Sequence, residues 1–246
     1  MTSKRIFVTG ASGCIGHYIV EALIQETNHD LFLLVRNLDK LKLDYNTRPG
    51  ITVLQGDMRE IEQFSDLLKT MDCAILIATA WGGAEEVLDI NVVKTIRLLN
   101  LLNPEVCRQV LYFSTESILD RNNQPLKEAG EIGTDYVRSK YNCFQQFSKL
   151  AIAPNITTLF PTLLLGGEAD KPWSHISGGI SKESKWINLI RFFSIDGSFH
   201  YIHSKDVAQV VRYLVDNPLA EEDCRTLVLG NPAITADQAI AEACDY

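Results

Sequence analysis

A tyrosine, a lysine and two hydroxyl residues in the middle of the chain are spaced for acid–base chemistry. Tyr136 and Lys140 are four residues apart, which would place them on one face of a helix. An ammonium beside a phenol favours the phenolate and lowers a pKa of about 10 toward neutrality. Ser114 and Thr115 end a short apolar run, where one hydroxyl could bind a substrate carbonyl or alcohol. We expect Tyr136 to act as an acid or base; the alternative is a surface tyrosine beside a solvated lysine.

A glycine-rich turn near the N-terminus is spaced for phosphate binding. The segment 9–16 (TGASGCIG) follows an apolar run and opens a helical one. Gly10 permits the tight turn, Gly13 lets the backbone approach a pyrophosphate, and Gly16 lets helix and strand pack closely. The helix N-terminus would add unpaired N–H groups and a partial positive charge. The alternative is a glycine-rich turn without a ligand.

The residue type at the end of the second predicted strand discriminates between dinucleotides. Arg36 comes 20 residues after Gly16. A carboxylate there would bind the ribose 2′-hydroxyl of NAD, whereas an arginine suits the 2′-phosphate of NADP. We therefore expect NADP, with NAD as the alternative if Asp39 supplies the acid. Asp57 is placed to contact adenine or only to cap a helix. Cys14 is expected to fill apolar space beneath the turn, although a thiol at a helix N-terminus can be reactive.

Short apolar runs alternate with longer helical runs over the first 160 residues. This order predicts βαβ units and an α/β Rossmann fold with a doubly wound parallel sheet. The expected strands are 5–9, 31–35, 51–55, 73–78, 109–114 and 156–160, and the expected helices are 14–26, 60–69, 84–102 and 134–151.

The rhythm changes after residue 160. A Gly-, Pro- and Ser-rich loop is expected over 161–179, followed by a helix over 183–193 and a strand over 199–202. A helix from Ser204 to Val215, a strand at 227–229 and a last helix from Thr235 complete the prediction. We expect residues 1–160 to form the dinucleotide-binding core. Segments 161–200 and 219–246 would form a small, shortened C-terminal substrate lobe, and 201–218 would return to the core, so the chain is effectively one domain.

Composition limits the class of protein. The chain has 246 residues, 46% of them hydrophobic, and a net charge of −8. These values exclude a disordered, collagen-like or coiled-coil chain, and the acidic balance argues against nucleic-acid binding. The longest apolar run, 73–81, is too short to span a membrane. The six cysteines and five histidines are scattered, so we expect no disulfide framework and no metal site. A soluble, cytoplasmic protein with buried free thiols is expected.

The ordered set of motifs resembles the extended, epimerase/dehydratase-type branch of the short-chain dehydrogenase/reductase superfamily. The resemblance runs from about Ile6 to about Val215. Its motifs are the turn at 9–16, Gly56-Asp57, Ala78-Thr79-Ala80, Asn91–Thr95, Ser114-Thr115, Tyr136 with Lys140, Pro161-Thr162, and His203–Ala208.

The resemblance implies a role for each matching residue. Thr115, Tyr136 and Lys140 are the implied catalytic residues, and Lys140 also binds the nicotinamide ribose. Asn91 is implied to be architectural. The implied cofactor-binding residues are Gly10, Ser12, Gly13, Cys14, Ile15, Gly16, Arg36, Asp57, Met58, Ala78, Thr79, Ala80, Lys140, Pro161 and Thr162.

The chain also departs from the family pattern. Ile118-Leu119-Asp120 replaces a common V-Y-G, and Phe160 stands where an arginine often precedes the proline. The family's substrate region usually continues past residue 246, so we expect a smaller or more open substrate pocket, or a missing C-terminal region. Segment 163–181, with Trp173 and His175, is expected to face the substrate, as is Trp186.

The resemblance implies an NADP(H)-dependent oxidoreductase that transfers a hydride to or from a secondary alcohol or carbonyl of a small molecule. One alternative is a nucleotide-sugar epimerase or dehydratase with tightly bound NAD. Another is a non-catalytic NADP-binding sensor or scaffold. The resemblance further implies a homodimer that pairs through the helices at 84–102 and 134–151.

Overall fold

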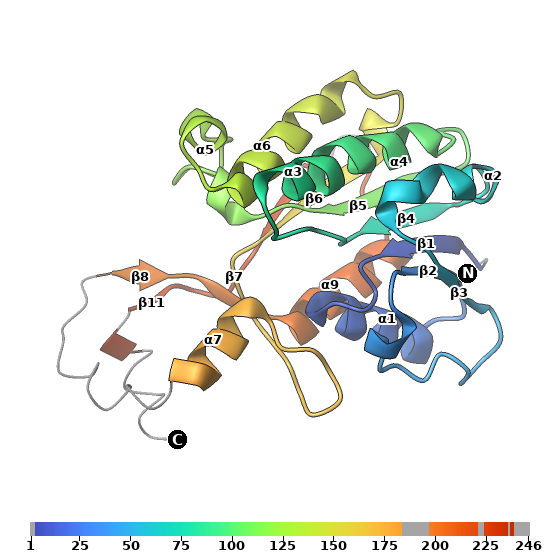
Figure 1. Cartoon of the computed structure of the whole chain (residues 1–246), viewed down its shortest axis with the longest axis horizontal. Coiled ribbons are helices and arrows are strands. Elements are labelled where there is room, and N and C mark those ends of the chain that lie inside the picture. The colour runs from blue at the N-terminus through green and yellow to red at the C-terminus, as the bar shows by residue number, and fades with distance from the viewer. Residues whose placement is uncertain (1–2, 184–196, 221–223, 236, 239–246) are drawn as a thin grey trace.

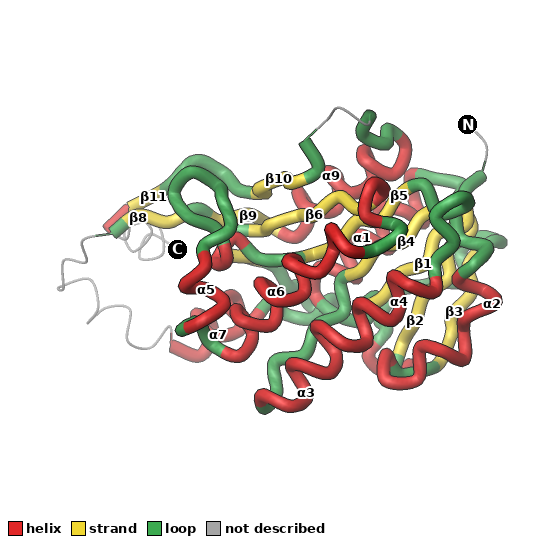
Figure 2. The backbone as a smooth tube through the Cα atoms, turned by 90° about the horizontal axis from the view of Figure 1, so that it is seen from above, coloured by secondary structure: helices red, strands yellow, loops and turns green. Residues whose placement is uncertain are grey.

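A seven-stranded, all-parallel sheet forms the centre of the molecule (Figures 1 and 2). The computed structural model describes residues 3–183, 197–220, 224–235 and 237–238. The strand order is β10-β6-β5-β4-β1-β2-β3. The strands are β1 (Arg5–Thr9), β2 (Asp30–Val35), β3 (Ile51–Gln55), β4 (Cys73–Leu76), β5 (Gln109–Phe113), β6 (Ile156–Pro161) and β10 (Thr226–Leu229). This is the doubly wound Rossmann order, and the expected fold class is confirmed.

Helices cover both faces of the sheet. On one face lie α1 (Cys14–Glu26) and α9 (Ser204–Asp216); on the other lie α3 (Ala84–Leu88), α4 (Thr95–Leu101) and α6 (Asp135–Gln146) (Figure 1). Successive residues of β1 serve the two faces, because Ile6 and Val8 pack toward α1 while Phe7 packs toward α4. Burial on both faces explains why the central strands are largely apolar.

Three predicted helices are not continuous α-helices. The run expected at 134–151 is α6, which ends at Gln146, followed by a 3-10 helix, Phe147–Lys149. The run expected at 60–69 is a 3-10 helix, Met58–Phe64, followed by the short α2 (Ser65–Leu68). The run expected at 84–102 contains a π-helix, Asp89–Lys94, between α3 and α4. The sequence predicts one long helix there because its apolar spacing continues across the interruption. The π-helix contains Asn91, whose side-chain contacts are described below.

The region after residue 160 contains more regular structure than expected. Strand β7 (Leu163–Leu165) pairs with β9 (Tyr201–His203), and β8 (Ser198–Phe199) pairs with β11 (Ile234–Thr235). Helix α7 (His175–Glu183) corrects the expected loop over 161–179. Its two glycines argue against a helix by propensity alone, but Ser174 caps it by accepting hydrogen bonds from Ser177 and Gly178. Helix α5 (Lys127–Glu131) lies between β5 and α6 along the chain.

Other predictions for this region have mixed outcomes. Helix α9 and strand β10 are found where they were expected. Strand β10 lies in the 219–246 segment assigned to the lobe, yet it pairs with β6 in the central sheet. The division of the chain at residue 160 stays a prediction. The helix expected over 183–193 and most of the last helix lie outside the described residues.

Candidate functional site

The main cavity opens at the carboxyl ends of the parallel strands, where the order of successive strands reverses between β1 and β4. Its volume is about 920 Å³. We call the part lined by residues 9–10, 12–15, 36–37, 40 and 56–58 the glycine end, and the part lined by 80–81, 114–117, 134, 136–137, 140 and 172–176 the tyrosine end. The sequence-predicted residues that line the cavity are Gly10, Ser12, Gly13, Cys14, Ile15, Arg36, Asp57, Met58, Ala78, Thr79, Ala80, Thr115, Tyr136, Lys140, Pro161 and Thr162.

Glycine is required at two positions of the turn for steric reasons. Gly10 has a φ of +75°, and a Cβ there would lie 2.7 Å from the Ala78 nitrogen. A Cβ on Gly16 would collide with the Gly10 carbonyl, and Gly16 does not line the cavity. Gly13 does line it, and a Cβ there would meet only the Gly10 carbonyl, at 3.4 Å. Gly16 therefore serves helix packing, while Gly13 leaves the main chain open to the cavity.

The N-terminus of α1 points its free N–H groups at this turn. Its N-cap, Gly13, has no side chain to cap the first turn. Buried His17 holds the turn instead: Nδ1 bonds the Gly13 carbonyl at 2.8 Å, and Nε2 accepts from the Lys42 N–H at 3.0 Å. Burial lowers the pKa of His17, so the ring is neutral with its proton on Nδ1. The sequence analysis missed His17, whose signal is a histidine four residues after the middle glycine of the turn.

Two cations line the glycine end beyond β2. Arg36 and Lys40 border the cavity together with Asn37, and the Arg36 side chain is 66% exposed. Asp39, the alternative acid, is not among the lining residues. Asp57 accepts a hydrogen bond from the Arg59 N–H at 2.9 Å, so it caps the following 3-10 helix while it also lines the cavity. Adenine contact by Asp57 stays a prediction.

Cys14 packs against Ser204, the first residue of α9. Its Sγ lies 3.4 Å from Ser204 Oγ, and burial raises the pKa of its thiol. A raised pKa disfavours the reactive thiolate. The structure thus favours the apolar-filler interpretation of Cys14.

Asn91 connects the end of β4 to α6. Its Oδ1 accepts from the Ala80 N–H at 2.7 Å and from Thr79 Oγ1 at 3.1 Å. Its Nδ2 donates to the Ala80 carbonyl and to Ser139 Oγ, at 3.1 Å and 3.0 Å. Asn91 sits in the π-helix, whose extra residue per turn brings this buried amide to the strand end. This buried network fixes the Thr79–Ala80 lining against the helix that carries the tyrosine.

Tyr136 and Lys140 lie near the start of α6, whose N-cap is Thr134. Lys140 is 2% exposed, and its Nζ donates to the Phe113 carbonyl at 2.8 Å. Its Nζ lies 5.9 Å from the centroid of the Tyr136 ring. Burial lowers the pKa of Lys140 to about 8. The spacing therefore places both groups at the same end of the cavity.

The expected acidity of Tyr136 is not found. Burial raises the pKa of the phenol above its usual value, and the hydrogen bond with Thr115 lowers it only in part. The lysine does not reverse this, because burial also disfavours its own charged form. Tyr136 is thus a protonated phenol at neutral pH in this structure.

Thr115 and Ser114 both border the cavity, but only Thr115 bonds Tyr136. Thr115 is also the N-cap of a 3-10 helix, and it accepts from the Ser117 N–H at 3.3 Å. The Ser114 side chain is 4% exposed and its Oγ has no partner among the described residues. Glu116 follows at the tyrosine end, and burial raises its pKa.

Trp81 lies directly over Tyr136, and the sequence analysis did not single it out. The two rings are stacked, with centroids 3.8 Å apart and planes at 16°. His175 also contacts Trp81, with centroids 4.7 Å apart. Trp173 lines the same end, as predicted, whereas Trp186 lies outside the described residues. The only sequence signal for Trp81 is an aromatic residue directly after the Ala78–Ala80 segment.

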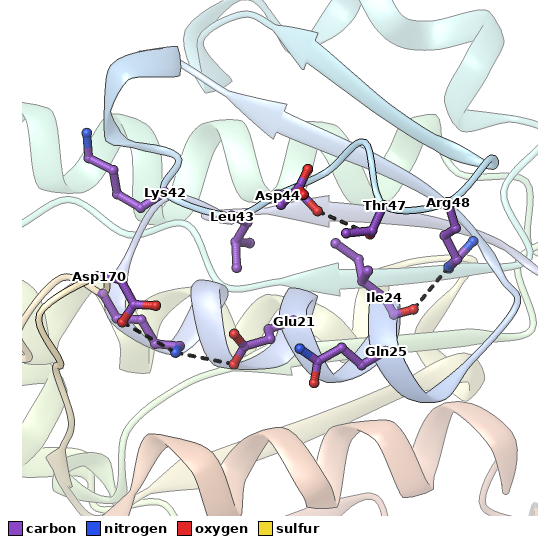
Figure 3. Close-up of a pocket in the computed structure, with 10 residues that line it drawn as sticks. Glu21, Ile24, Gln25, Lys42, Leu43, Asp44, Thr47, Arg48 and Asp170 are labelled. Carbon is purple, nitrogen blue, oxygen red and sulfur yellow. Dashed lines mark hydrogen bonds and ion pairs between the residues drawn. The ribbon is translucent and has the colours of Figure 1, made fainter.

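A second, smaller cavity of about 400 Å³ lies between α1 and the chain at 42–48 (Figure 3). It shares no lining residue with the main cavity. Its buried cation, Lys171, contacts Glu21, Glu168 and Asp170. Arg48 donates to the carbonyls of Ile24, His29 and Pro49. Lys171 and Arg48 thus have partners within the protein, and Lys42 and Asp44 also line this cavity.

The described residues contain no group of side chains that could hold a metal ion. None of the helices in the described part of the chain is long and apolar enough to span a membrane.

Comparison with known proteins identifies the family. The model of the NAD dependent epimerase/dehydratase family matches residues 6–230, so the chain belongs to this family. It is an NAD(P)-dependent enzyme of the extended short-chain dehydrogenase/reductase type.

Three individual proteins are similar to the chain. A sterol-4-alpha-carboxylate 3-dehydrogenase (decarboxylating) from Dictyostelium discoideum is 22% identical over 87% of this chain and 68% of its own. The terminal R domain of the myxalamid PKS-NRPS pathway has a TM-score of 0.83 and 19% identity, over 100% of this chain and 70% of its own. Bordetella bronchiseptica WbmG, solved with NAD, has a TM-score of 0.73 and 14% identity, over 100% and 78%. These structural likenesses support the fold.

Proposed function

We propose that this protein is an NADP(H)-dependent oxidoreductase that transfers a hydride to or from a carbonyl or secondary-alcohol carbon of a small molecule. The observation that carries the proposal is the sharing of one cavity by the glycine turn and by Thr115, Tyr136 and Lys140. A dinucleotide site and an acid–base pair are both needed for this chemistry, and they lie at its two ends.

The residues of the glycine end fit a dinucleotide. Gly13 leaves the main chain open, and the uncapped start of α1 offers N–H groups to a pyrophosphate. Arg36 and Lys40 supply positive charge where a 2′-phosphate would bind, while Asp39 stays outside the lining. These features support NADP over NAD. When bound, the dinucleotide supplies or accepts the hydride.

The tyrosine end supplies the proton. In the reductive direction the protonated Tyr136 phenol donates to the carbonyl oxygen, and its raised pKa keeps that proton available at neutral pH. Thr115, which bonds Tyr136, helps to fix the same oxygen. The Lys140 Nζ lies near the Tyr136 ring, and this ammonium would bind the nicotinamide ribose. The secondary alcohol thus receives the proton on its oxygen from Tyr136 and the hydrogen on its carbon as one hydride.

The reducing interior of a cell suits the described cysteines. Cys73, Cys107 and Cys143 are buried free thiols, and such proteins act mostly in reducing compartments. We therefore place the reaction in the cytoplasm. The epimerase alternative predicts tightly held NAD in the purified protein, and the sensor alternative predicts cellular function without Tyr136.

Removing the Tyr136 hydroxyl tests the proposal. The measurement is NADPH oxidation with a panel of ketones and aldehydes, in wild type and in Tyr136→Phe. We expect wild-type turnover and a loss of about a thousandfold in the variant, because a positioned acid contributes about 10²–10⁴ in rate. NADPH affinity and thermal stability should stay unchanged. Wild-type turnover by Tyr136→Phe on an accepted substrate would overturn the assignment.

A further inference from the structure

The phenol expected to donate the proton is covered on one ring face by an indole. Trp81 stacks on Tyr136 at 3.8 Å, and 52% of its surface is exposed. An exposed tryptophan at a cavity wall gains much free energy when a ligand buries its apolar surface, and it offers a flat face for stacking. A substrate that reaches the Tyr136 hydroxyl must therefore pass along or replace this indole.

A second indole faces the same end from another part of the chain. Trp173 lines the cavity and is 59% exposed. Its ring packs on Gly167, where a Cβ would lie 2.6 Å from the indole. Gly167 has a φ of +128°, so both its backbone and its lack of a side chain suit this seat. The indole is thereby held by the loop.

The loop that carries Trp173 is tied to the core. The Ser174 N–H donates to the Gly166 carbonyl at 2.9 Å, and the Gly167 N–H donates to Tyr18 Oη at 3.3 Å. Lys171, itself 8% exposed, pairs with Glu21 of α1 at 3.3 Å. A loop with these anchors presents its indole in a fixed position, which reduces the entropy lost on binding.

The charge distribution at the tyrosine end disfavours an anionic substrate. Of the described residues that line the cavity, the cations are Arg36, Lys40 and Lys140. The first two lie at the glycine end, and Lys140 is buried and donates to the Phe113 carbonyl. The carboxylate of Glu116 borders the tyrosine end. A diphosphate would find no free lysine or arginine among the described residues there. Besides His175, which contacts Trp81, the wall of this end contains the polar Ser117, Thr134 and Ser174 and the apolar Pro172 and Ile176.

We propose that the substrate class is an uncharged carbonyl compound or carbinol with a flat, apolar group, such as an aryl ketone, and that Trp81 determines this specificity by stacking on that group. This proposal rests on the proposed function and narrows its substrate. In the reduction, the carbonyl carbon accepts the hydride and the oxygen accepts the Tyr136 proton, so the ketone becomes a carbinol. NADPH is the reductant and leaves as NADP⁺, and solvent returns the proton to Tyr136.

A pair of ketones that differ in flatness tests the proposal. Acetophenone and cyclohexyl methyl ketone have similar size and polarity, but only the first carries a flat ring. We expect wild type to have a kcat/KM about fivefold or more higher for acetophenone, since an aromatic pair adds roughly this factor beyond buried area. Trp81→Leu should remove the preference through KM, whereas Trp81→Phe should keep most of it. An unchanged ratio in Trp81→Leu would overturn the proposal.

A binding measurement separates this proposal from the proposed function. Saturation-transfer NMR on the NADP⁺-loaded protein would compare 1-phenylethanol, 1-cyclohexylethanol and UDP-glucose. Preferential, Trp81-dependent binding of 1-phenylethanol supports the substrate class even where turnover is absent, and absent turnover refutes only the proposed function. Turnover that depends on Tyr136, together with tighter binding of UDP-glucose or equal binding of both alcohols, refutes the substrate class alone.

Discussion

The glycine end of the main cavity is made largely of main chain, whereas the tyrosine end is made of large side chains from separate segments. At the glycine end, contiguous residues 9–16 form the turn, and two of its glycines are fixed by collisions that any Cβ would cause. At the tyrosine end, Trp81, Tyr136 and Trp173 come from three segments. A ligand shared by many enzymes, such as a dinucleotide, is expected to bind a main-chain surface. A substrate that differs between enzymes is expected to bind side chains, which can be exchanged.

This contrast explains what the sequence could predict. A main-chain site leaves a local signature, because the steric demand for glycine at residues 10 and 16 is written into consecutive positions. Helix α1 was accordingly predicted with its observed bounds, Cys14–Glu26. Lys140 and Tyr136 were found because helical spacing is also local.

The rest of the site depends on long-range contacts. Nothing in the sequence around Trp81 indicates that it would stack on a ring 55 positions later. His17 accepts a hydrogen bond from the Lys42 N–H, 25 residues later. Asn91 donates to Ser139 from a π-helix, which apolar spacing does not reveal. The raised pKa of Tyr136 results from burial, which only the tertiary structure defines.

The two turn glycines should fail in different ways. Gly13→Ala should weaken NADPH binding about a hundredfold with unchanged melting temperature, because its methyl would obstruct N–H groups that bind phosphate. Gly16→Ala should lower the melting temperature by about 5–10 °C, because the added carbon collides with the Gly10 carbonyl. Calorimetry and thermal melts measure both. Gly83→Ala is the control, since a Cβ there meets no atom within 4 Å. Equal behaviour of Gly13→Ala and Gly16→Ala would contradict the distinction.

Buried Lys140 should make the free energy of unfolding of the protein depend on pH. The pKa of Lys140 falls from 10.5 to about 8 on folding, so between these values the folded chain binds fewer protons than the unfolded chain. Stability should therefore rise with pH through that window, by about 3 kcal/mol relative to Lys140→Met. Urea unfolding at pH 7.5, 9 and 10.5 measures this. The exposed Lys149→Met serves as control, and a flat difference between wild type and Lys140→Met would contradict the assignment.

Calorimetric titration with NADPH and NADH, on wild type and Arg36→Ala, tests the central claim most directly. The claim is that the glycine end binds a dinucleotide and that Arg36 recognises its 2′-phosphate. We predict that wild type binds NADPH more tightly than NADH, and that Arg36→Ala loses about tenfold for NADPH alone, since the guanidinium, which is 66% exposed and 3.8 Å from Asp57, would add one charged contact to the 2′-phosphate. Failure to bind either dinucleotide would contradict the account. So would NADH binding that is at least as tight as NADPH binding and is unchanged in Arg36→Ala.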